Sequence, residues 1–146
     1  MSVFNETLAA LDQGNQPGRW AFIPYDQLSA QTGVLRDTQP ADLGLIFCET
    51  RWKPRQRPYH KQKLALLLSN QRQFALEMAR AGYAIRYLDD DRPYANVLED
   101  CIDECGVIDV MEPAELELRE QLQPLVDRGL IRPLPNDYWF TTVDDF

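Results

Sequence analysis

The sequence predicts an α/β domain, a doubly wound sheet of five parallel strands with helices on both faces. Short apolar runs alternate along the chain with longer amphipathic segments, as in parallel sheets joined by right-handed crossovers. The 146 residues are enough for one ordinary domain with a full hydrophobic core. A composition of 45% apolar and 26% charged residues is that of a globular protein in water.

Residues 1–18 are predicted to be an N-terminal extension, and residues 19–146 the α/β domain. The extension begins with a short amphipathic helix that ends at Gly14, and a Pro/Gly linker follows. It lacks the basic and apolar regions of a signal peptide, and no apolar run approaches the roughly 18 residues of a membrane span. We therefore expect a cytoplasmic protein without membrane contact.

Five apolar runs are the predicted strands. The first closes at Pro24 and the second reads as a buried strand. Between these two lies a long polar loop, and loops of this length in compact domains are often functional. The strands span residues 19–24, 43–49, 83–88, 107–112 and 130–135.

Helices are predicted to follow the second, third and fourth strands. The clearest covers about 60–81 and ends at Gly82. The next lies within 89–106, and the last covers 113–129, with Pro113 in its first turn and Pro124 where a kink can form. In the first of them the polar Gln71 interrupts a face of apolar residues at helical spacing. These apolar residues are Leu64, Leu67, Leu68, Phe74, Ala75 and Met78.

Polar residues at the predicted strand ends are the candidate binding residues, because ligands of parallel sheets bind beyond the carboxyl ends, where strand order reverses. Asp26 and Gln27 follow the first strand, and their acceptors and donors suit a heterocycle edge or a ribityl chain. Asp26 equally suits a turn cap. Glu49 and Glu112 close two further strands. No glycine-rich phosphate loop follows the first strand, and nothing groups the two glutamates with a nucleophile, so no catalytic residue is expected.

Residues 51–63 concentrate positive charge. They hold six of the 15 Lys and Arg residues and no acid, so the rest of the chain carries 9 bases against 23 acids. Such an acidic domain is a poor nucleic-acid binder, and DNA contact is expected to be indirect. A nucleic-acid contact, an anion clamp and a solvated loop compete as interpretations of this stretch. His60 and Lys61 begin a helix, where free N–H groups attract anions and the dipole disfavours cations, which favours an anion site.

The three cysteines, Cys48, Cys101 and Cys105, suggest neither a disulfide framework nor a zinc site. Cys101 and Cys105 are four residues apart on a predicted helix, but no second pair exists and His60 is remote in sequence. We expect buried small hydrophobes and no metal ligands.

A series of short motifs points to a known family through its order and spacing. The motifs are Asp26-Gln27-Leu28, Cys48-Glu49, His60-Lys61 with Lys63, Arg72 with Phe74, Gly82-Tyr83, Arg86-Tyr87 and Glu112-Pro113. From about Trp20 to its C-terminus the chain resembles the N-terminal domain of the deoxyribodipyrimidine photolyase-related proteins. These are bacterial photolyases with an iron–sulfur cluster, and they include prokaryotic (6-4) photolyases. Tyr25 stands where the family has glycine, and Glu117 where relatives tend to have arginine.

The resemblance implies an antenna domain with strand order 3-2-1-4-5 and a ribityllumazine-type chromophore near the strand ends. FAD, the [4Fe–4S] cluster and the DNA lesion would belong to a larger helical C-terminal part that these residues lack. That part, in cis or in trans, is the expected partner and acceptor of excitation energy. The pocket would be lined by Asp26, Gln27, Glu49 and Glu112, with His60 and Lys61 at its rim.

Three questions stay open on the sequence alone. The same sheet suits a small nucleotide-binding enzyme or sensor, or a scaffold whose pocket is empty. The loop from Arg51 to Pro58 matches no motif of the family, and it is where contact with DNA or a partner domain would be sought.

Overall fold

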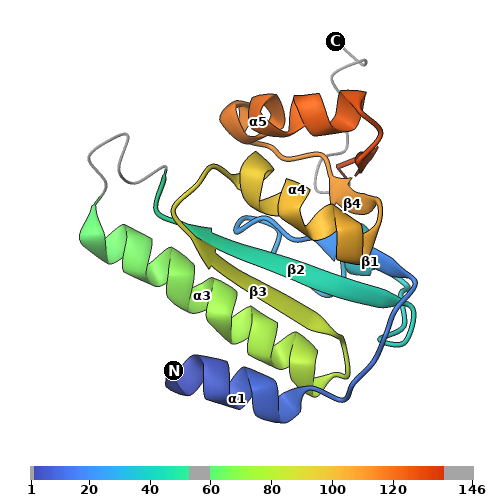
Figure 1. Cartoon of the computed structure of the whole chain (residues 1–146). Helices are drawn as coiled ribbons and strands as arrows, with labels where there is room; N and C mark the ends of the chain where they lie inside the picture. The colour runs from blue at the N-terminus through green and yellow to red at the C-terminus, as the bar shows by residue number, and fades with distance from the viewer. Residues whose placement is uncertain (1, 53–59, 137–146) are drawn as a thin grey trace.

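The computed structural model describes residues 2–52 and 60–136 (Figure 1). The five strands of this part are parallel and form one sheet in the order β3-β2-β1-β4-β5. The predicted fold class and the strand order 3-2-1-4-5 are therefore confirmed. In chain order the elements are α1 (Val3–Leu11), β1 (Arg19–Phe22), the 3-10 helix η1 (Gly33–Leu35), β2 (Leu43–Thr50), α3 (Lys61–Arg80), β3 (Ile85–Asp90), α4 (Tyr94–Cys105), β4 (Ile108–Met111), α5 (Leu116–Asp127) and β5 (Ile131–Leu134).

The second strand, β2, lies inside the sheet and is buried along its whole length. Its sequence, LGLIFCET, is the near-continuous apolar run of a parallel strand that is covered on both faces. Gly44 lets the indole of Trp20 on β1 lie against the backbone of β2, because a Cβ on Gly44 would be 2.5 Å from that ring.

Two hydrophobic cores fill the two faces of the sheet, because alternate residues of each strand point to opposite sides. Phe22 and Ile46 belong to the core beneath α4 and α5. Phe47 and Met111 belong to the core on the other face, to which α3 and η1 contribute. Figure 1 shows α4 and α5 on one side of the sheet and α3 with α1 on the other.

The helix predicted over 60–81 is present as α3, and Gly82 follows it with a φ of 104°. The buried face of this helix was predicted only half correctly. The three predicted leucines of its first half are not buried, because that half extends beyond the sheet: Leu64, Leu67 and Leu68. Gln71, the polar interruption of the pattern, is 2% exposed and donates a hydrogen bond of 3.2 Å to the carbonyl of Cys48.

The last helix, α5, begins later than predicted. Its first residue is Leu116 and its N-cap position is Glu115, so Pro113 precedes the helix instead of lying in its first turn. Pro124 lies inside the helix, as expected. Gly106 ends α4 as predicted, with a φ of 70°.

The N-terminal helix, α1, ends at Leu11, before the predicted end at Gly14. None of its residues is buried, and it packs against α3. The ring of Phe4 meets that of Tyr87 edge-on at a centroid distance of 4.6 Å, and the guanidinium of Arg72 lies 5.3 Å from the Phe4 centroid. Aromatic and cation–π contacts thus attach α1 to the domain.

Cys48, Cys101 and Cys105 are free and buried, as predicted. Burial raises the pKa of the Cys48 thiol to about 12, so this thiol stays protonated at neutral pH. Within residues 2–52 and 60–136, no three His, Cys, Asp or Glu side chains are grouped as metal ligands. The same residues contain no helix that is both long and apolar enough to span a bilayer.

Candidate functional site

The strand order reverses between β1 and β4, which are neighbours in the sheet although they are distant in the sequence. In open parallel sheets this reversal opens the crevice that binds ligands, beyond the carboxyl ends of the strands. The segments that follow β1 and β4 therefore form the candidate site. We call them the switch edge, and we call the neighbouring ends of β2 and β3 the outer edge.

At the switch edge, the turn after β1 is fastened to the end of β4. Gln27 is 5% exposed, and its amide nitrogen Nε2 donates a hydrogen bond of 3.0 Å to the carbonyl of Met111. The hydroxyl of Tyr25 donates to Oε2 of Glu115 at 2.6 Å. Asp26, between these two residues, is exposed. Tyr25, Gln27 and Glu115 thus come together across the reversal.

Glu112 follows β4, and both its backbone N–H and its backbone carbonyl form hydrogen bonds. Its N–H donates to the carbonyl of Leu134 at 2.7 Å, and its carbonyl accepts from Asn136 at 2.9 Å. Its carboxylate oxygen Oε1 accepts from Nη1 of Arg119 at 3.2 Å. In the described part of the chain, Nε of Arg119 is buried and has no hydrogen-bond partner. Because an unpaired buried donor costs free energy, Arg119 is suited to bind an acceptor atom of a ligand.

A second unpaired polar atom lies in the loop after β1. Oγ1 of Thr32 is buried without a hydrogen-bond partner among the described residues. The next residue, Gly33, touches the side chain of Met111 so closely that an added Cβ would lie 2.9 Å from its sulfur. The loop therefore passes against the end of β4, and Thr32 belongs to the surroundings of the switch edge.

At the outer edge, Glu49 is the penultimate residue of β2 and is 6% exposed. Arg72 of α3 binds both carboxylate oxygens, with Nε–Oε1 of 2.6 Å and Nη2–Oε2 of 2.9 Å. The hydroxyl of Tyr87 donates to Oε1 as well, and Gln71 donates to that hydroxyl at 3.2 Å. Bidentate, charge-assisted bonds of this kind are strong. We call these four residues the Glu49 network.

The ionisation of the Glu49 network follows from its geometry. Burial raises the pKa of Tyr87, and the hydrogen bond to Glu49 raises it further. The hydrogen bond to Glu49 likewise raises the pKa of Arg72. A neutral hydroxyl and a cation therefore face Glu49 at physiological pH, and its acceptor sites are largely occupied by protein donors.

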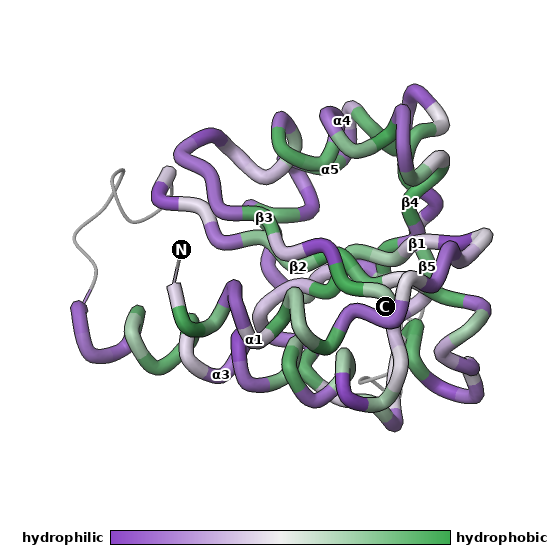
Figure 2. The backbone as a smooth tube through the Cα atoms, turned by 60° about the horizontal axis from the view of Figure 1, so that its bottom comes forward, coloured by the Kyte–Doolittle hydropathy of each residue, from purple (hydrophilic) through white to green (hydrophobic). Residues whose placement is uncertain are grey.

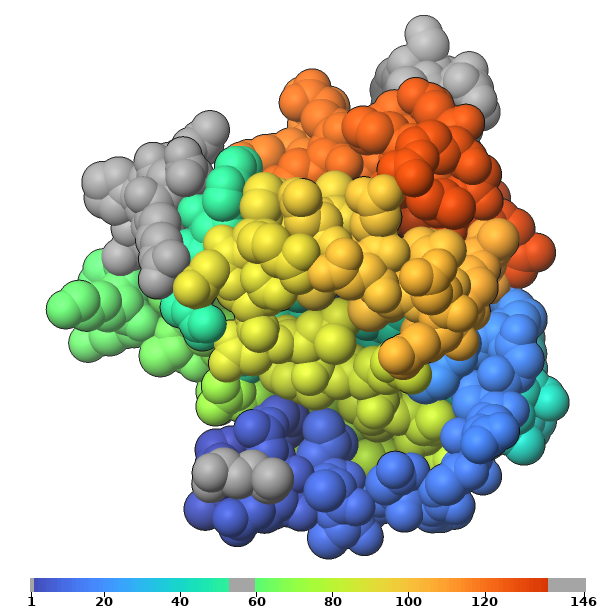
Figure 3. Space-filling view, viewed as in Figure 1, coloured from blue at the N-terminus to red at the C-terminus, as the bar shows by residue number. Residues whose placement is uncertain are grey.

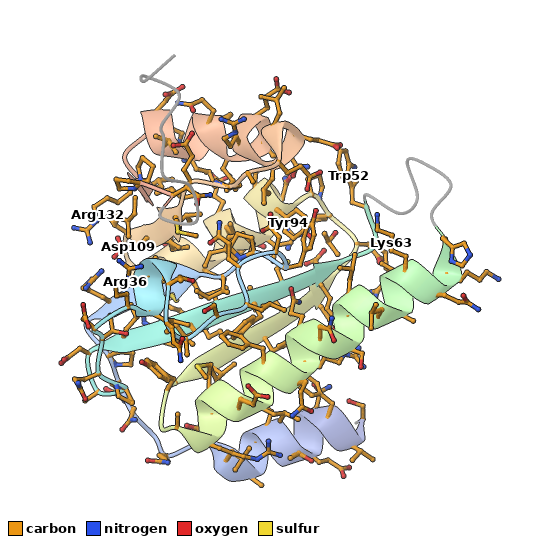
Figure 4. All side chains as sticks on the ribbon, turned by 180° about the vertical axis from the view of Figure 1, so that it is seen from behind. Arg36, Trp52, Lys63, Tyr94, Asp109 and Arg132 are labelled. Atoms are coloured by element: carbon orange, nitrogen blue, oxygen red, sulfur yellow. The ribbon has the colours of Figure 1, made fainter. Side chains whose placement is uncertain are left out.

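His60 and Lys61 begin α3. Nδ1 of His60 accepts a hydrogen bond of 3.2 Å from the backbone N–H of Gln62, so His60 caps the helix. Lys61 is exposed. The first buried residue of α3 is Gln71, and at about 1.5 Å per residue it lies roughly 15 Å along the helix from Lys61. Figure 4 shows Lys63 of the same helical end beside the carboxyl end of β2.

The structure thus divides the six predicted site residues. Gln27 and Glu112 lie at the switch edge, and the exposed Asp26 follows β1 beside them. Glu49 has its own network at the outer edge, and His60 and Lys61 lie at the start of α3. The prediction missed Glu115 and Arg119, although a signal existed. Arg119 follows Glu112 by seven residues, so the first turns of α5 bring it back to the strand end.

The chemistry of the switch edge fits a ribityllumazine. Such a molecule needs hydrogen-bond donors and acceptors for its ring and polar partners for the hydroxyls of its ribityl chain. Arg119 offers a buried donor, Asp26 an exposed carboxylate and Thr32 a buried hydroxyl. Glu49 is the least suitable of the predicted lining residues, because Arg72 and Tyr87 already bind it.

The fold is that of a doubly wound α/β domain with a polar switch edge. A family model described as deoxyribodipyrimidine photo-lyase-related protein matches residues 21–146, and the chain belongs to this family. A (6-4) photolyase from Agrobacterium fabrum is 28% identical to it over 104 residues. This match covers 66% of the chain and 20% of the relative, so the chain spans about a fifth of that protein. The resemblance read from the sequence motifs is confirmed.

One segment singled out in the sequence lies largely outside the described residues. It is the basic loop from Arg51 to Pro58, of which residues 53–58 are not described. Arg51 itself is described, and its guanidinium binds Asp89 at 2.6 Å and Asp91 at 2.5 Å. Acidic residues thus surround the first positive charge of the basic stretch.

Proposed function

We propose that this domain is the antenna or regulatory domain of a photolyase-related, light-dependent DNA-repair flavoprotein. It binds a ribityllumazine-type chromophore at the switch edge and passes excitation energy to a flavin held by another part of the assembly. No bond of a substrate is made or broken by this chain, and DNA is contacted only through that other part. The domain acts in the cytoplasm.

One observation carries the proposal beyond family membership: Nε of Arg119, a buried donor without a partner in the described part of the chain, lies at the switch edge. Sheets of this class bind ligands at this place. A buried donor is normally satisfied, so its bond is expected to go to a molecule that the chain itself does not supply.

The residues of the site have separable tasks. Arg119 donates to an acceptor on the chromophore, and Glu112 holds its guanidinium in place. Gln27 fixes the turn after β1 through its bond to Met111, which sets the position of Asp26. Asp26 accepts from ribityl hydroxyls. The bound chromophore supplies absorption in the near ultraviolet or blue.

The absorption spectrum of protein freshly purified from its native cells tests the proposal. The wild type should carry a near-ultraviolet to blue band of a lumazine, and Arg119→Gln should lose most of it. Arg128→Gln is the matched control, because Arg128 follows the same helix but binds Glu99 on the surface, at 2.6 Å. A colourless wild-type protein, or equal bands in the two variants, would contradict the proposed function.

A scaffold domain without chromophore is the second candidate, and two contacts favour it. The bond of 2.6 Å from Tyr25 to Glu115 crosses the strand reversal. The side-chain nitrogen of Gln27 is engaged by Met111. On this alternative, Tyr25→Gly, which restores the residue of the family pattern, gives no absorption band. On the antenna proposal, the same change leaves the band in place or strengthens it.

A further inference from the structure

The helix α3 has two halves in different environments. All of its buried residues lie in the second half: Gln71, Phe74, Ala75, Met78 and Ala79. Residues 61–70 contain none, and at about 1.5 Å per residue they extend roughly 15 Å. Figure 1 shows this half projecting beyond the strand ends, and Figure 3 shows its green surface at the margin of the molecule. We call residues 61–70 the overhang.

The middle of the overhang, residues 64–68, is apolar, although none of these residues is buried. Residues 64–68 read Leu-Ala-Leu-Leu-Leu, and Figure 2 shows this hydrophobic run after a hydrophilic first turn. Because a helix turns about 100° per residue, five consecutive apolar residues surround it on every side. Leu66 is 61% exposed, and Leu64, Leu67 and Leu68 are partly buried. A helix that is apolar all round is normally buried, and an exposed patch of this kind marks an interaction site.

The positive charge of the overhang limits which kind of partner can cover it. Lys61 and Lys63 precede the apolar run, whereas the chain outside residues 51–63 has 9 bases against 23 acids. Two copies of the chain each carry a net charge of −8, so pairing of two overhangs in a symmetric dimer is disfavoured. The surface fits a polypeptide groove that is apolar along its floor and acidic at its rim.

The position of the overhang suggests which polypeptide this is. Because α3 follows β2, the overhang stands next to the outer edge, at the carboxyl ends of the strands, and Gln27 and Glu112 lie at the same end of the sheet. A partner large enough to cover this end of the sheet therefore also reaches the switch edge. The Agrobacterium relative matches this chain over 20% of its length, so four-fifths of it lies outside the match. The family match runs to residue 146.

We infer that the overhang is the surface on which this larger part of a photolyase-related protein docks, in the same chain or in another. The inference rests on the proposed function, because docking there brings the flavin-bearing part to the chromophore site. Lys61 contacts the acidic rim of the docked part, and the leucines 64, 66, 67 and 68 enter its groove.

A photo-crosslinking amino acid at position 66 tests the inference, with the protein expressed from its own gene in its native cells. Cross-linked peptides are identified by mass spectrometry. The expected product joins position 66 to a peptide of the larger part of a photolyase-related protein. Position 107 is the control, because Val107 is 52% exposed but lies just before β4, at the opposite edge of the sheet. The control position should yield no such product.

Other outcomes overturn the inference. Cross-links between two copies of residues 61–70 would identify a dimer surface, and cross-links to lipid, to unrelated proteins or to nothing would reject the partner. The charge is tested separately with Lys61→Glu, which should lower the yield of the position-66 product about tenfold. An acid at a helix N-terminus suits the dipole, so this variant should unfold at the same temperature as the wild type or higher. An unchanged yield would contradict the role of Lys61.

The inference and the proposed function fail separately. Chromophore binding is read from the absorption spectrum, and docking from the cross-link. A coloured protein without the cross-link would reject the docking surface alone. A colourless protein with the cross-link would keep the docking surface and reject the antenna function.

Discussion

The two edges at the carboxyl ends of the strands both carry glutamates, but their hydrogen bonding differs. At the outer edge, Glu49 receives two bonds from Arg72 and one from Tyr87. At the switch edge, Glu112 receives one longer bond from Arg119, whose Nε is left without a partner among the described residues. A strand-end carboxylate is therefore not a ligand site by its position alone. The outer edge is closed by the bonds of Glu49 to Arg72 and Tyr87, whereas the switch edge has a buried donor without a partner among the described residues.

A similar closed arrangement occurs at the opposite end of the sheet, at the amino end of β4. The carboxylate of Asp109 is buried and binds Arg19 at 2.6 Å and Arg132 at 2.8 Å. Figure 4 shows Asp109 and Arg132 together, far from Trp52 and Lys63 at the carboxyl edge. The buried carboxylates of Glu49 and Asp109 are thus both paired with arginine. Among the described residues, two buried arginine nitrogens have no hydrogen-bond partner, Nε of Arg86 and Nε of Arg119, and the second of these lies at the switch edge.

The largest effect should come from opening the Glu49 network. Arg72→Met leaves Glu49 buried without its cation, and removal of one partner of a buried pair costs about 3 to 5 kcal/mol. The side chain of Arg72 is 43% exposed, so we expect the lower end of this range. Urea unfolding of the full chain measures the loss.

Its control is another arginine of the same helix. Arg80→Met changes an exposed residue in the last turn of α3 and should alter the free energy of unfolding by no more than about 0.5 kcal/mol. Equal losses in the two variants would show that Glu49 is not held by Arg72. The contrast between the two edges would then be lost.

Tyr87→Phe should give the next largest effect, and this effect should depend on pH. A hydrogen bond to a charged group contributes about 1.5 to 3 kcal/mol, and Tyr87 donates such a bond to Glu49. The pKa of Tyr87 is raised in the folded protein. Its contribution is therefore complete below the pKa of the unfolded chain, near 10, and is lost as the pH rises further.

The difference in unfolding free energy between the wild type and Tyr87→Phe, measured from pH 7 to pH 11, checks this linkage. It should be constant up to about pH 9 and then shrink. A difference that grows with rising pH would mean that folding favours the ionised hydroxyl. That result is incompatible with a donor bond to Glu49.

Gln27→Ala should have a smaller effect. The change leaves the buried carbonyl of Met111 without its side-chain donor, and an unsatisfied buried group costs about 1 to 3 kcal/mol. Because only one neutral bond is lost, we expect about 1 to 2 kcal/mol in urea unfolding. Gln31→Ala, at an exposed position of the same loop, should be silent. A silent Gln27→Ala would mean that the turn after β1 is not fastened to β4.

The strands and helices were predicted well from the sequence, because an apolar run or a helical spacing of apolar residues involves only residues that are close together in the chain. The boundary between the two halves of α3 could not be predicted, because periodicity does not report how far the sheet extends beneath a helix. The same limit explains Gln71, which interrupts the apolar face of the helix in the sequence. In the structure Gln71 is buried, and its side chain forms hydrogen bonds with Cys48 and Tyr87.

The sequence predicted where the candidate site lies, but not which residues there are available to a ligand. Gln27, Glu49 and Glu112 were selected by their positions at strand ends, whereas the capacity of each to bind a ligand depends on hydrogen-bond partners distant in the sequence. Glu49 is bound by residues 23 and 38 positions away, and no spacing rule connects them. Whether a strand-end carboxylate is engaged is thus decided by tertiary structure.

Asp26→Asn should give the smallest change in stability and the sharpest test of the switch edge. Asp26 is exposed, and interactions of exposed charged groups contribute little, so the free energy of unfolding should change by no more than about 1 kcal/mol. Its carboxylate is proposed to accept from ribityl hydroxyls, and the amide offers a single acceptor oxygen, so the chromophore band per mole of protein should fall severalfold. Asp42→Asn, an exposed change at the end of the same loop, is the control. A band that survives Asp26→Asn but disappears in Glu49→Gln would place the chromophore at the outer edge and reverse the comparison of the two edges.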